Sequence, residues 1–300
     1  MPRVGIAPKL VEFASGLLTQ QDNQETAGFG RSEFPEGTER EGEQMGSVVL
    51  PVRAGAAAPL TQKLSQSVPL SASELPLLRD LQSGNRLFRR GQEIIAEGRK
   101  YRTLFIIMEG VGVRYRVLRD GRRHVLNVML PGDIAGVPGC FFESALYSVR
   151  TLTDLRASPV PFARIMGLFH THPQLAAKMF WSFSCETAIY AEHLIAIGRR
   201  NALERVAHFL LELLTRLQGL RLADERSFSL PLTQELIADA LGLSVPYVNQ
   251  VLRSLRDEKL VCIKDKLIVI NDVEALSALV DFEQTYLKPL SIVEMLNEAA

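Results

Sequence analysis

The sequence predicts an α+β protein with three parts: a β-roll, a long helix, and a helical domain that ends in a hairpin. Short runs of alternating hydrophobicity, separated by turn residues, fill residues 87–162, which is typical of compact rolls and barrels. Beyond Pro173 the apolar residues recur every three or four positions, which indicates a helix. Residues 200–270 then show three helical patterns followed by a strand pair. A length of 300 residues suits two such domains with a tail.

The composition is that of a globular protein and excludes several classes. Lys plus Arg and Asp plus Glu both total 34, so the chain is not uniformly basic, although a basic face is compatible with that sum. Cys140, Cys185 and Cys262 lie too far apart in sequence for a disulfide framework, a structural zinc site or a cysteine-ligated cluster. Lys9 and Glu12 interrupt the apolar run that a signal peptide needs, and no stretch of about 18 uncharged apolar residues occurs. We therefore expect a cytoplasmic protein without membrane segment, metal or cofactor.

Residues 1–58 are predicted to form a disordered extension. A polar run from Gln20 to Glu25 is followed by closely spaced glutamates, and Gly, Pro and Ala dominate as far as Pro59. Such a stretch has too little apolar surface to offset the entropy of the chain. The first folded domain, an effector β-roll, is therefore expected to span residues 59–172.

A hairpin is the clearest element of the predicted roll. Residues 111–118 alternate with period two, residues 124–130 resume as a strand, and Asp120-Gly121 lies between them. An Asp-Gly pair between two alternating runs is a strong hairpin signal, because both residues tolerate a positive φ. The second strand is expected to stop at Pro131-Gly132.

A heptad seam predicts that residues 173–198 form a dimerisation helix. Such a seam can also pack on its own domain, but Trp181 and Ile189 fall outside it and are available for that packing, which favours a dimer interface. Gly198-Arg199-Arg200 is expected to mark the end of the helix or a hinge. The seam consists of Phe180, Phe183, Thr187, Tyr190, Leu194 and Ile197.

Residues 199–272 predict a winged helix-turn-helix domain, followed by a tail over residues 273–300. Thr233 and Ser244 are good N-caps for two successive helices, and Gly242 stands where the tight turn between them needs a positive φ. An ordinary helical hairpin is the alternative, but small and apolar residues fall at each core position of the motif. Residues 263–270, turning at Asp265, would form the wing.

The second helix of this motif would enter the major groove of DNA with its first turns against the bases. Asn249 and Gln250 can pair with adenine, and Val245 or Pro246 can touch a thymine methyl group. The candidates for phosphate contacts, which position the helix, are Tyr247, Arg253, Arg256 and Lys259. The predicted DNA-binding residues are Thr233, Ser244, Val245, Pro246, Tyr247, Asn249, Gln250 and Arg253.

The order of these parts resembles the Crp/Fnr family of bacterial transcription regulators, over roughly residues 60–285. Residues 118–123 and 130–136 are similar to the strand-turn-strand before the family's phosphate-binding cassette, and residues 198–208 to the hinge and first helix of its DNA-binding domain. The resemblance implies a double-stranded β-helix (jelly-roll) of the cyclic-nucleotide-binding type joined to a winged helix-turn-helix. It also implies a homodimer that binds a palindromic operator and acts through RNA polymerase.

The resemblance fails at the positions that would bind cyclic AMP. Family members that bind it use a Glu after the central Gly of the cassette and an Arg-Ser pair further on. Here Gly136 is followed by Val137, and the later pair falls near Tyr147 and Ser148, while the adenine contact on the dimer helix falls near Tyr190. Cyclic AMP is therefore not expected to be the ligand. Gly136, Val137, Tyr147, Ser148 and Tyr190 remain the candidate effector pocket.

Other inputs stay open at this point. An iron–sulfur centre of the family type would need cysteines near the amino end, and none precedes Cys140. Haem would need an axial histidine, and isolated histidines are more often structural. The effector is a small molecule of unidentified type, an oxidation at Cys185 or Cys262, or absent.

Two further function classes compete with a DNA-binding regulator. The family often places Glu and Arg where Pro246 and Gln250 stand, so the motif could instead mediate protein contacts within a ligand-binding signalling module. If the motif does read DNA, the half-sites should differ from the TGTGA or TTGAT type at the guanine that Arg reads. An enzyme is the weakest alternative, because we find no Ser-His-Asp set, metal-spaced cluster or complete phosphate loop, and we expect no catalytic residues.

Overall fold

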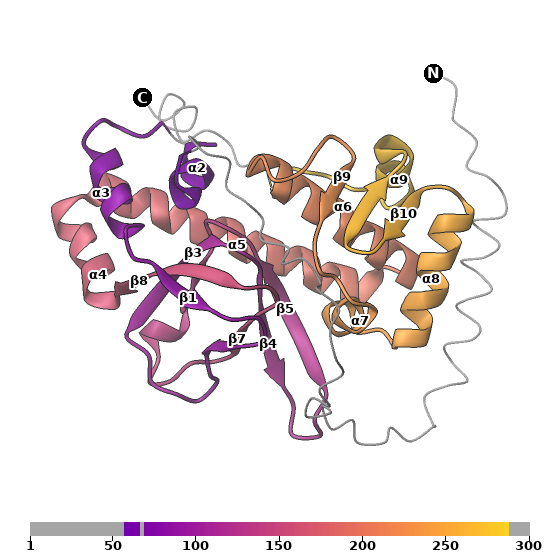
Figure 1. The fold of residues 1–300 in the computed structure, drawn as a ribbon, viewed down its shortest axis with the longest axis horizontal. Helices are drawn as coiled ribbons and strands as arrows, with labels where there is room; N and C mark the ends of the chain where they lie inside the picture. Colours follow the sequence, from indigo (N-terminus) through magenta and orange to yellow (C-terminus); the bar gives the residue numbers. More distant parts are fainter. Residues whose placement is uncertain (1–56, 67–68, 288–300) are drawn as a thin grey trace, which may run out of the picture.

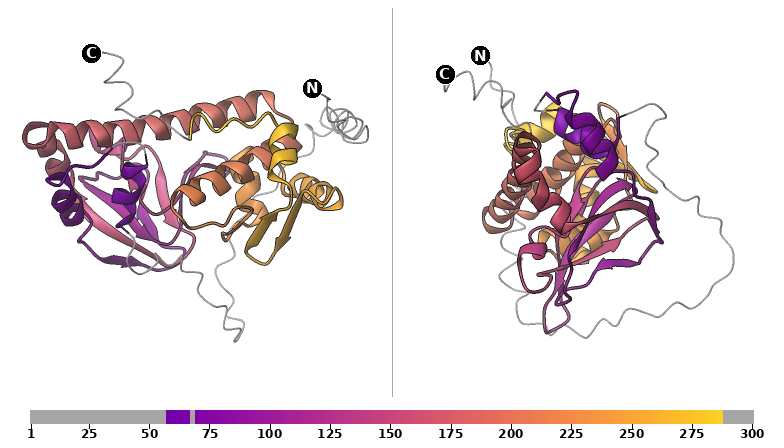
Figure 2. Two further views of the ribbon diagram at one scale, coloured as in Figure 1. Left: turned by 90° about the horizontal axis from the view of Figure 1, so that it is seen from above. Right: turned by 90° about the vertical axis from the view of Figure 1, so that its left-hand side faces the viewer.

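The structure is a computed structural model and describes residues 57–66 and 69–287. The extension predicted for residues 1–58 lies almost entirely outside these residues, and so does the end of the predicted tail. Two bodies are joined by one long helix, with the β-roll at one end and the helix-turn-helix at the other (Figures 1 and 2). The predicted fold class, a roll followed by a long helix and a winged helix-turn-helix, is confirmed.

Two antiparallel sheets form the roll (Figure 1). One has the strand order β1-β8-β3-β6 and the other β2-β7-β4-β5, so all neighbours except β4 and β5 are non-consecutive in sequence. This crossing-over encloses an apolar interior that includes Phe88, Phe105 and Met129. The strands are β1 (Arg86–Phe88), β2 (Glu93–Ile95), β3 (Thr103–Glu109), β4 (Gly112–Val117), β5 (Arg123–Met129), β6 (Ile134–Ala135), β7 (Ser148–Thr151) and β8 (Leu155–Pro161).

The predicted hairpin is formed by β4 and β5. Gly112 pairs with Met129 at one end and Val117 with Arg123 at the other, and Gly121 in the turn has φ +86°. A positive φ is accessible to glycine at no steric cost, which explains why the chain reverses at Asp120-Gly121. The strand β5 also ends at Met129, next to the predicted stop at Pro131.

Short helices cover one end of the roll. These are α2 (Pro59–Ser65), α3 (Glu74–Leu81), α4 (Phe162–Thr171) and the 3-10 turn η1 (Gly139–Phe141). Leu60 and Leu64 of α2 are fully buried in a core that also contains Leu175 and Met179 of the long helix. The helix α2 thereby closes the gap between the roll and the helix that follows it.

The long helix α5 (Pro173–Arg199) runs along the whole molecule (Figure 2). It passes through Gly198 and ends at Arg199, close to the predicted hinge, and Arg200 is already extended. Asn201 then caps α6 (Ala202–Gly219): its side chain accepts from the Glu204 amide while the Glu204 carboxylate accepts from the Asn201 amide. Two helices therefore meet at a defined break of two residues.

The remaining elements are those of a winged helix-turn-helix. After α6 come β9 (Ser227–Ser229), α7 (Gln234–Leu241), α8 (Val245–Asp257), β10 (Val261–Lys264), β11 (Leu267–Ile270) and α9 (Val273–Leu279). The wing turns at Asp265 as expected, with φ +55°. The helix α9 falls in the segment predicted as a tail, yet Leu276 is fully buried, so this segment belongs to the domain core.

One apolar core runs through both domains. Val113 of β4 and Val128 of β5 belong to the same buried cluster as Leu210 of α6 and Ile237 of α7. The helix α7 lies against β5. The helix-turn-helix domain is therefore docked on the outer face of the roll rather than connected by a free linker.

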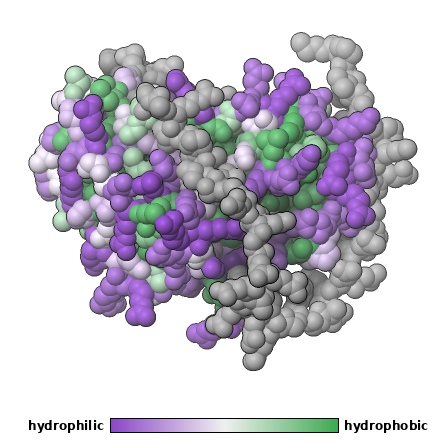
Figure 3. All heavy atoms as spheres, viewed as in Figure 1, coloured by the Kyte–Doolittle hydropathy of each residue, from purple (hydrophilic) through white to green (hydrophobic). Residues whose placement is uncertain are grey.

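On the face shown in Figure 3, hydrophilic side chains predominate among the coloured residues, including those on the right-hand side where α8 lies. Isolated apolar residues appear between them. None of the helices in the described ranges is long and apolar enough to cross a membrane.

Candidate nucleic-acid interface and effector pocket

The turn between α7 and α8 has the geometry that the motif requires. The Thr233 hydroxyl accepts from the Leu236 amide at 3.1 Å and caps α7. Gly242 ends that helix with φ +64° and ψ +38°, a left-handed conformation in which a Cβ is disfavoured. Ser244 occupies the N-cap of α8, but its side chain makes no capping bond there. Pro246, with its preset φ, is the second residue of the helix, which begins at Val245.

The exposed face of α8 carries most of the predicted DNA-binding side chains. Its other face is buried through Val248, Val251 and Leu255. Val245 and Tyr247 are half-buried and pack against the same core, so they face the groove less than the sequence pattern suggested. The exposed set is Thr233, Ser244, Pro246, Asn249, Gln250, Arg253 and Arg256.

Arg205 supports this motif from behind and was not singled out from the sequence. Its Nε donates to the Arg200 carbonyl at 2.8 Å, and Nη1 donates to the Leu241 carbonyl at 3.2 Å. Burial lowers the pKa of Arg205, and nearby Tyr247 and Glu204 oppose this effect. A cation at the carboxyl end of α7 is favourable because the last carbonyls of a helix are negative. Arg205 thus ties the break after α5 to the turn before α8.

Contacts link three of the predicted effector-pocket residues, Val137, Tyr147 and Tyr190, by way of Arg114. Gly136 directly follows β6 with φ +108°, and Val137 comes next and is buried. The Tyr147 hydroxyl donates to the Val137 carbonyl, and the Ser148 hydroxyl accepts from the Glu97 amide at 3.0 Å. Tyr190 reaches the same region from α5 through its contact with Arg114. That these residues bind an effector stays a prediction.

Arg114 lies buried among these candidate residues. Its side chain is 0% exposed, and Nη1 donates to Glu186 Oε1 at 2.6 Å and to the Tyr190 hydroxyl. The guanidinium carbon lies 4.7 Å from the centre of the Tyr147 ring, in cation–π contact. Nη2 also donates to the Ile134 carbonyl at 3.4 Å. Arg114 therefore brings Tyr147 and Tyr190 together around its own side chain.

The surroundings of Arg114 shift its own pKa and that of Tyr147. Burial by itself lowers the pKa of Arg114, but Glu186 and Tyr190 more than reverse this, so that the pKa lies above its ordinary value. Burial raises the pKa of Tyr147 to about 12. At neutral pH the pocket thus contains a guanidinium cation paired with the Glu186 carboxylate.

The alternation of residues in β4 could have indicated from the sequence that Arg114 is buried. In β4, Val113 and Arg114 point to opposite faces, and the apolar face is ordinarily assigned to the interior. Here Val113 and Val128 face the DNA-binding domain, so Arg114 and its cross-strand partner Asn127 lie on the opposite face. Asn127 is also buried. An arginine paired across two strands with an asparagine is therefore the sequence feature that indicates buried polar side chains here.

The predicted dimer seam is split between two faces of α5. Phe180 and Leu194 are 64% and 73% exposed, and Thr187 is exposed as well. Phe183 packs instead against the core beside α2, Tyr190 meets Arg114, and Ile197 is half-buried. The exposed stripe keeps the heptad spacing but is rotated toward smaller residues: Ala177, Phe180, Ser184, Thr187, Ala191, Leu194 and Gly198. Trp181 and Ile189 pack inward, as expected.

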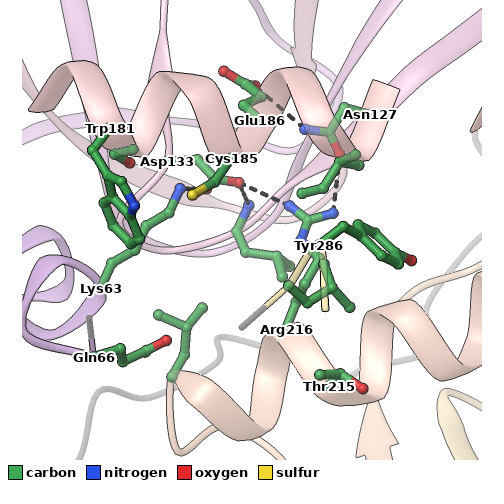
Figure 4. A pocket seen from close by; sticks show the side chains of 15 residues that line it. Lys63, Gln66, Asn127, Asp133, Trp181, Cys185, Glu186, Thr215, Arg216 and Tyr286 are labelled. Atoms are coloured by element: carbon green, nitrogen blue, oxygen red, sulfur yellow. Dashed lines mark hydrogen bonds and ion pairs between the residues drawn. The ribbon is translucent and has the colours of Figure 1, made fainter. Parts of the chain in front are cut away.

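A buried polar network joins the roll to α6 (Figure 4). Arg216 of α6 donates to Asn127 Oδ1 at 3.0 Å and to the Val128 carbonyl at 2.9 Å, and it pairs with Asp133 at 3.2 Å. Glu212, one turn earlier on α6, pairs with His193 of α5 at 2.9 Å. A cavity of about 90 Å³ lies beside Arg216, lined also by Trp181 and Cys185.

Cys140 and Cys185 are not poised for oxidation as thiolates. Burial raises the pKa of Cys140 to about 11 and also raises the pKa of Cys185. A thiol with a raised pKa carries little of the reactive thiolate at neutral pH. Cys262, on the wing, is exposed.

Together the fold and the two sites define a class of protein: a helix-turn-helix domain docked on a cyclic-nucleotide-binding-like roll. Family models match both parts, the "Cyclic nucleotide-binding domain" over residues 85–172 and the "Crp-like helix-turn-helix domain" over residues 204–279. The chain belongs to the Crp/Fnr family of DNA-binding transcription regulators.

Named relatives support that assignment. The nitrogen fixation regulation protein FixK of Rhizobium meliloti is 32% identical over 66% of this chain and 89% of its own length. The transcriptional activatory protein AadR of Rhodopseudomonas palustris is 30% identical over 59% of this chain and 73% of its own. The structure of FixK2 from Bradyrhizobium japonicum matches with a TM-score of 0.59 and 27% identity, covering 65% of this chain and 96% of that one.

Proposed function

We propose that this protein is a homodimeric, cytoplasmic transcription activator that binds palindromic operator DNA and acts through RNA polymerase without cyclic AMP. The observation that carries the DNA-binding part is the open face of α8. Pro246, Asn249 and Gln250 project from its first turns, the part of a recognition helix that meets the bases. Arg253 and Arg256 extend the same face toward the phosphates.

The second copy is proposed to pair through the exposed stripe of α5. Phe180 and Leu194 are large apolar residues exposed near its two ends, and heptad spacing lets them pack against the same residues of a partner helix. Small residues between them, such as Ser184 and Ala191, allow two helices to approach closely. A dimer matches a palindromic operator because both have two-fold symmetry.

Independence from cyclic AMP is proposed because Arg114 occupies the region where the nucleotide would lie. The carboxylate that would hold a ribose hydroxyl is replaced by Val137, and Tyr147 and Tyr190 close on the guanidinium. The two tyrosines also carry raised pKa values, because burial keeps their hydroxyls neutral.

Activation, rather than repression, is supported by relatives named as transcriptional activators, among them FnrL of Cereibacter sphaeroides.

The test is a binding-site selection on random DNA with the full chain, without effector and at two salt concentrations. A two-fold symmetric motif with half-sites about one helical turn apart is expected. The Asn249→Ala/Gln250→Ala double variant should lose sequence preference, whereas Arg253→Ala should weaken binding to all sequences alike. Sequence-blind, steeply salt-dependent binding by the wild type would favour the alternative, in which the motif serves protein contacts.

The selected operator then tests the remaining parts of the proposal. Addition of cyclic AMP should leave the dissociation constant for the operator unchanged. Transcription in vitro with RNA polymerase from a template bearing the operator should increase with added protein. A decrease would identify a repressor instead.

A further inference from the structure

Arg114 connects β4 with β6 and with α5, the elements that an effector bound here would also contact. From β4 it binds Glu186 and Tyr190 of α5, and it also donates to Ile134 of β6. Tyr147, stacked on the guanidinium, is itself bonded to Val137 in the cassette loop. One side chain thus joins the sheet, the loop and the long helix at the centre of the roll.

The contacts continue from this point to the DNA-binding domain. Glu186 Oε1, which accepts from Arg114, also accepts from Asn127 Nδ2 at 3.4 Å. Asn127 Oδ1 accepts from Arg216 Nη1 at 3.0 Å (Figure 4). Arg216 lies on α6, the first helix of the DNA-binding domain. Four buried or half-buried side chains therefore form an unbroken path from the pocket to α6.

We propose that Arg114 is an internal ligand whose guanidinium holds the pocket in its bound state and, through Glu186 and Asn127, keeps α6 in the position required for operator binding. This inference rests on the proposed function, because its output is DNA affinity. It also assigns a ligand class to the emptied pocket. With the side chain removed, Glu186 and the ring of Tyr147 remain, and together they select a planar alkylguanidinium cation.

The experiment removes the guanidinium and then returns it. Full-length Arg114→Ala protein should bind the selected operator about tenfold more weakly than the wild type, within the range of ordinary coupling between two sites. Millimolar n-propylguanidinium should restore most of that affinity, whereas n-propylammonium at equal concentration should not, because it lacks the planar fork. A variant that is not rescued, or one that binds like the wild type, overturns the inference.

A matched control separates coupling from general stability. Lys178 of α5 and Glu74 of α3 form another buried ion pair, 2.6 Å apart, and neither belongs to the path from Arg114 to Arg216. Lys178→Ala should be indifferent to n-propylguanidinium. Rescue of Lys178→Ala by the same compound would overturn the inference, since the compound would then act unspecifically.

A second variant keeps the test decisive if Arg114→Ala fails to fold. In the Arg114→Met/Glu186→Leu double variant, apolar side chains replace the pair, a change that buried ion pairs often tolerate without loss of stability. The double variant should retain its thermal unfolding midpoint but lose operator affinity, because Asn127 has lost its link to the pocket. Wild-type affinity in the double variant would show that Arg114 is only structural.

Trp181 gives a readout that does not depend on DNA. It is the single tryptophan of the chain and lines the cavity beside Arg216 and Glu186. Addition of n-propylguanidinium to Arg114→Ala should shift its fluorescence toward the wild-type spectrum. If the wild type binds no operator at all, the proposed function fails, and this spectral shift still decides the internal-ligand inference.

Discussion

Arg123 of β5 and Asp239 of α7 form an ion pair between the two domains, with a nitrogen–oxygen distance of 2.5 Å. Both side chains are about three-quarters buried, in contrast to the exposed arginines at the hairpin tip. The pair stands at the edge of the shared apolar core, where Val125 of β5 is buried. The docking of α7 on the roll is therefore fixed by charge at the edge and by apolar contact beneath it.

Reversal of one charge in this pair should loosen the docking. Asp239→Lys places a cation opposite Arg123, and we expect the free energy of unfolding to fall by about 1 kcal/mol, the upper range for a partly exposed pair. The Arg123→Glu/Asp239→Lys double variant should recover most of that loss in urea denaturation. If the double variant is as unstable as the single one, the pair contributes nothing specific.

Leu194 tests the dimer stripe. Leu194→Glu places a carboxylate in an apolar seam, and we expect the protein to become monomeric in sedimentation at micromolar concentration and to lose affinity for the palindromic operator. Leu118→Glu makes the same change at an exposed leucine of the β4–β5 turn and is expected to remain dimeric. A dimeric Leu194→Glu protein would place the interface elsewhere.

Gln250 tests the assignment of base contacts. Its side chain is exposed on the second turn of α8, where glutamine favours adenine and arginine favours guanine. Gln250→Arg should therefore move the preference at one position of each half-site toward guanine, by roughly 1–3 kcal/mol. Binding-site selection with both proteins measures this, and identical motifs would show that Gln250 does not touch that base.

His208 predicts a decline of stability in mild acid. The side chain is 2% exposed and lies against Phe282, with ring centres 4.9 Å apart. Burial and nearby Arg200 lower the pKa of His208 to about 4. Since the unfolded chain binds this proton first, its contribution to stability is complete above about pH 6.5 and is lost as the pH falls toward 4.

The expected loss is about 1 kcal/mol between pH 6.5 and pH 5.5, which follows from 1.36 kcal/mol per unit at full titration. His208→Gln should flatten this part of the profile, as measured by urea denaturation at each pH. His193 remains in both proteins and contributes with the opposite sign, since Glu212 raises its pKa against the effect of burial. His170→Gln, at an exposed histidine, should leave the profile as in the wild type.

The local signals in the sequence predicted the elements that depend on local chemistry. Gly242 must be left-handed at its turn, Asp120-Gly121 must reverse a hairpin, and Thr233 must cap a helix wherever the domain is placed. These requirements act over a few residues and do not depend on which surface is covered. The strands, the long helix and the helix-turn-helix were predictable for that reason.

What the sequence could not supply was which face of an element is covered by another domain. Both Phe180 and Phe183 look like seam residues, but α2 and the roll cover Phe183 and leave Phe180 outside. Likewise the alternation in β4 could not show that Val113 faces the DNA-binding domain and Arg114 the interior. Only the long-range packing of α6 and α7 on the sheet decides between the two faces.

The core shared by Val113, Val128 and Leu210 limits how this protein can be recombined with its relatives. A chimera cut at the break after Arg199 would transplant α6 and α7 without the strand surface that shaped them. Exposed valines on β4 and β5 would then be left to find another apolar surface, and the product would tend to aggregate. Specificity can be exchanged between family members more safely within α8, whose outward face shares no atoms with that core. The exposed residues of α8 can therefore change, and operator preference with them, without altering the core that joins the two domains.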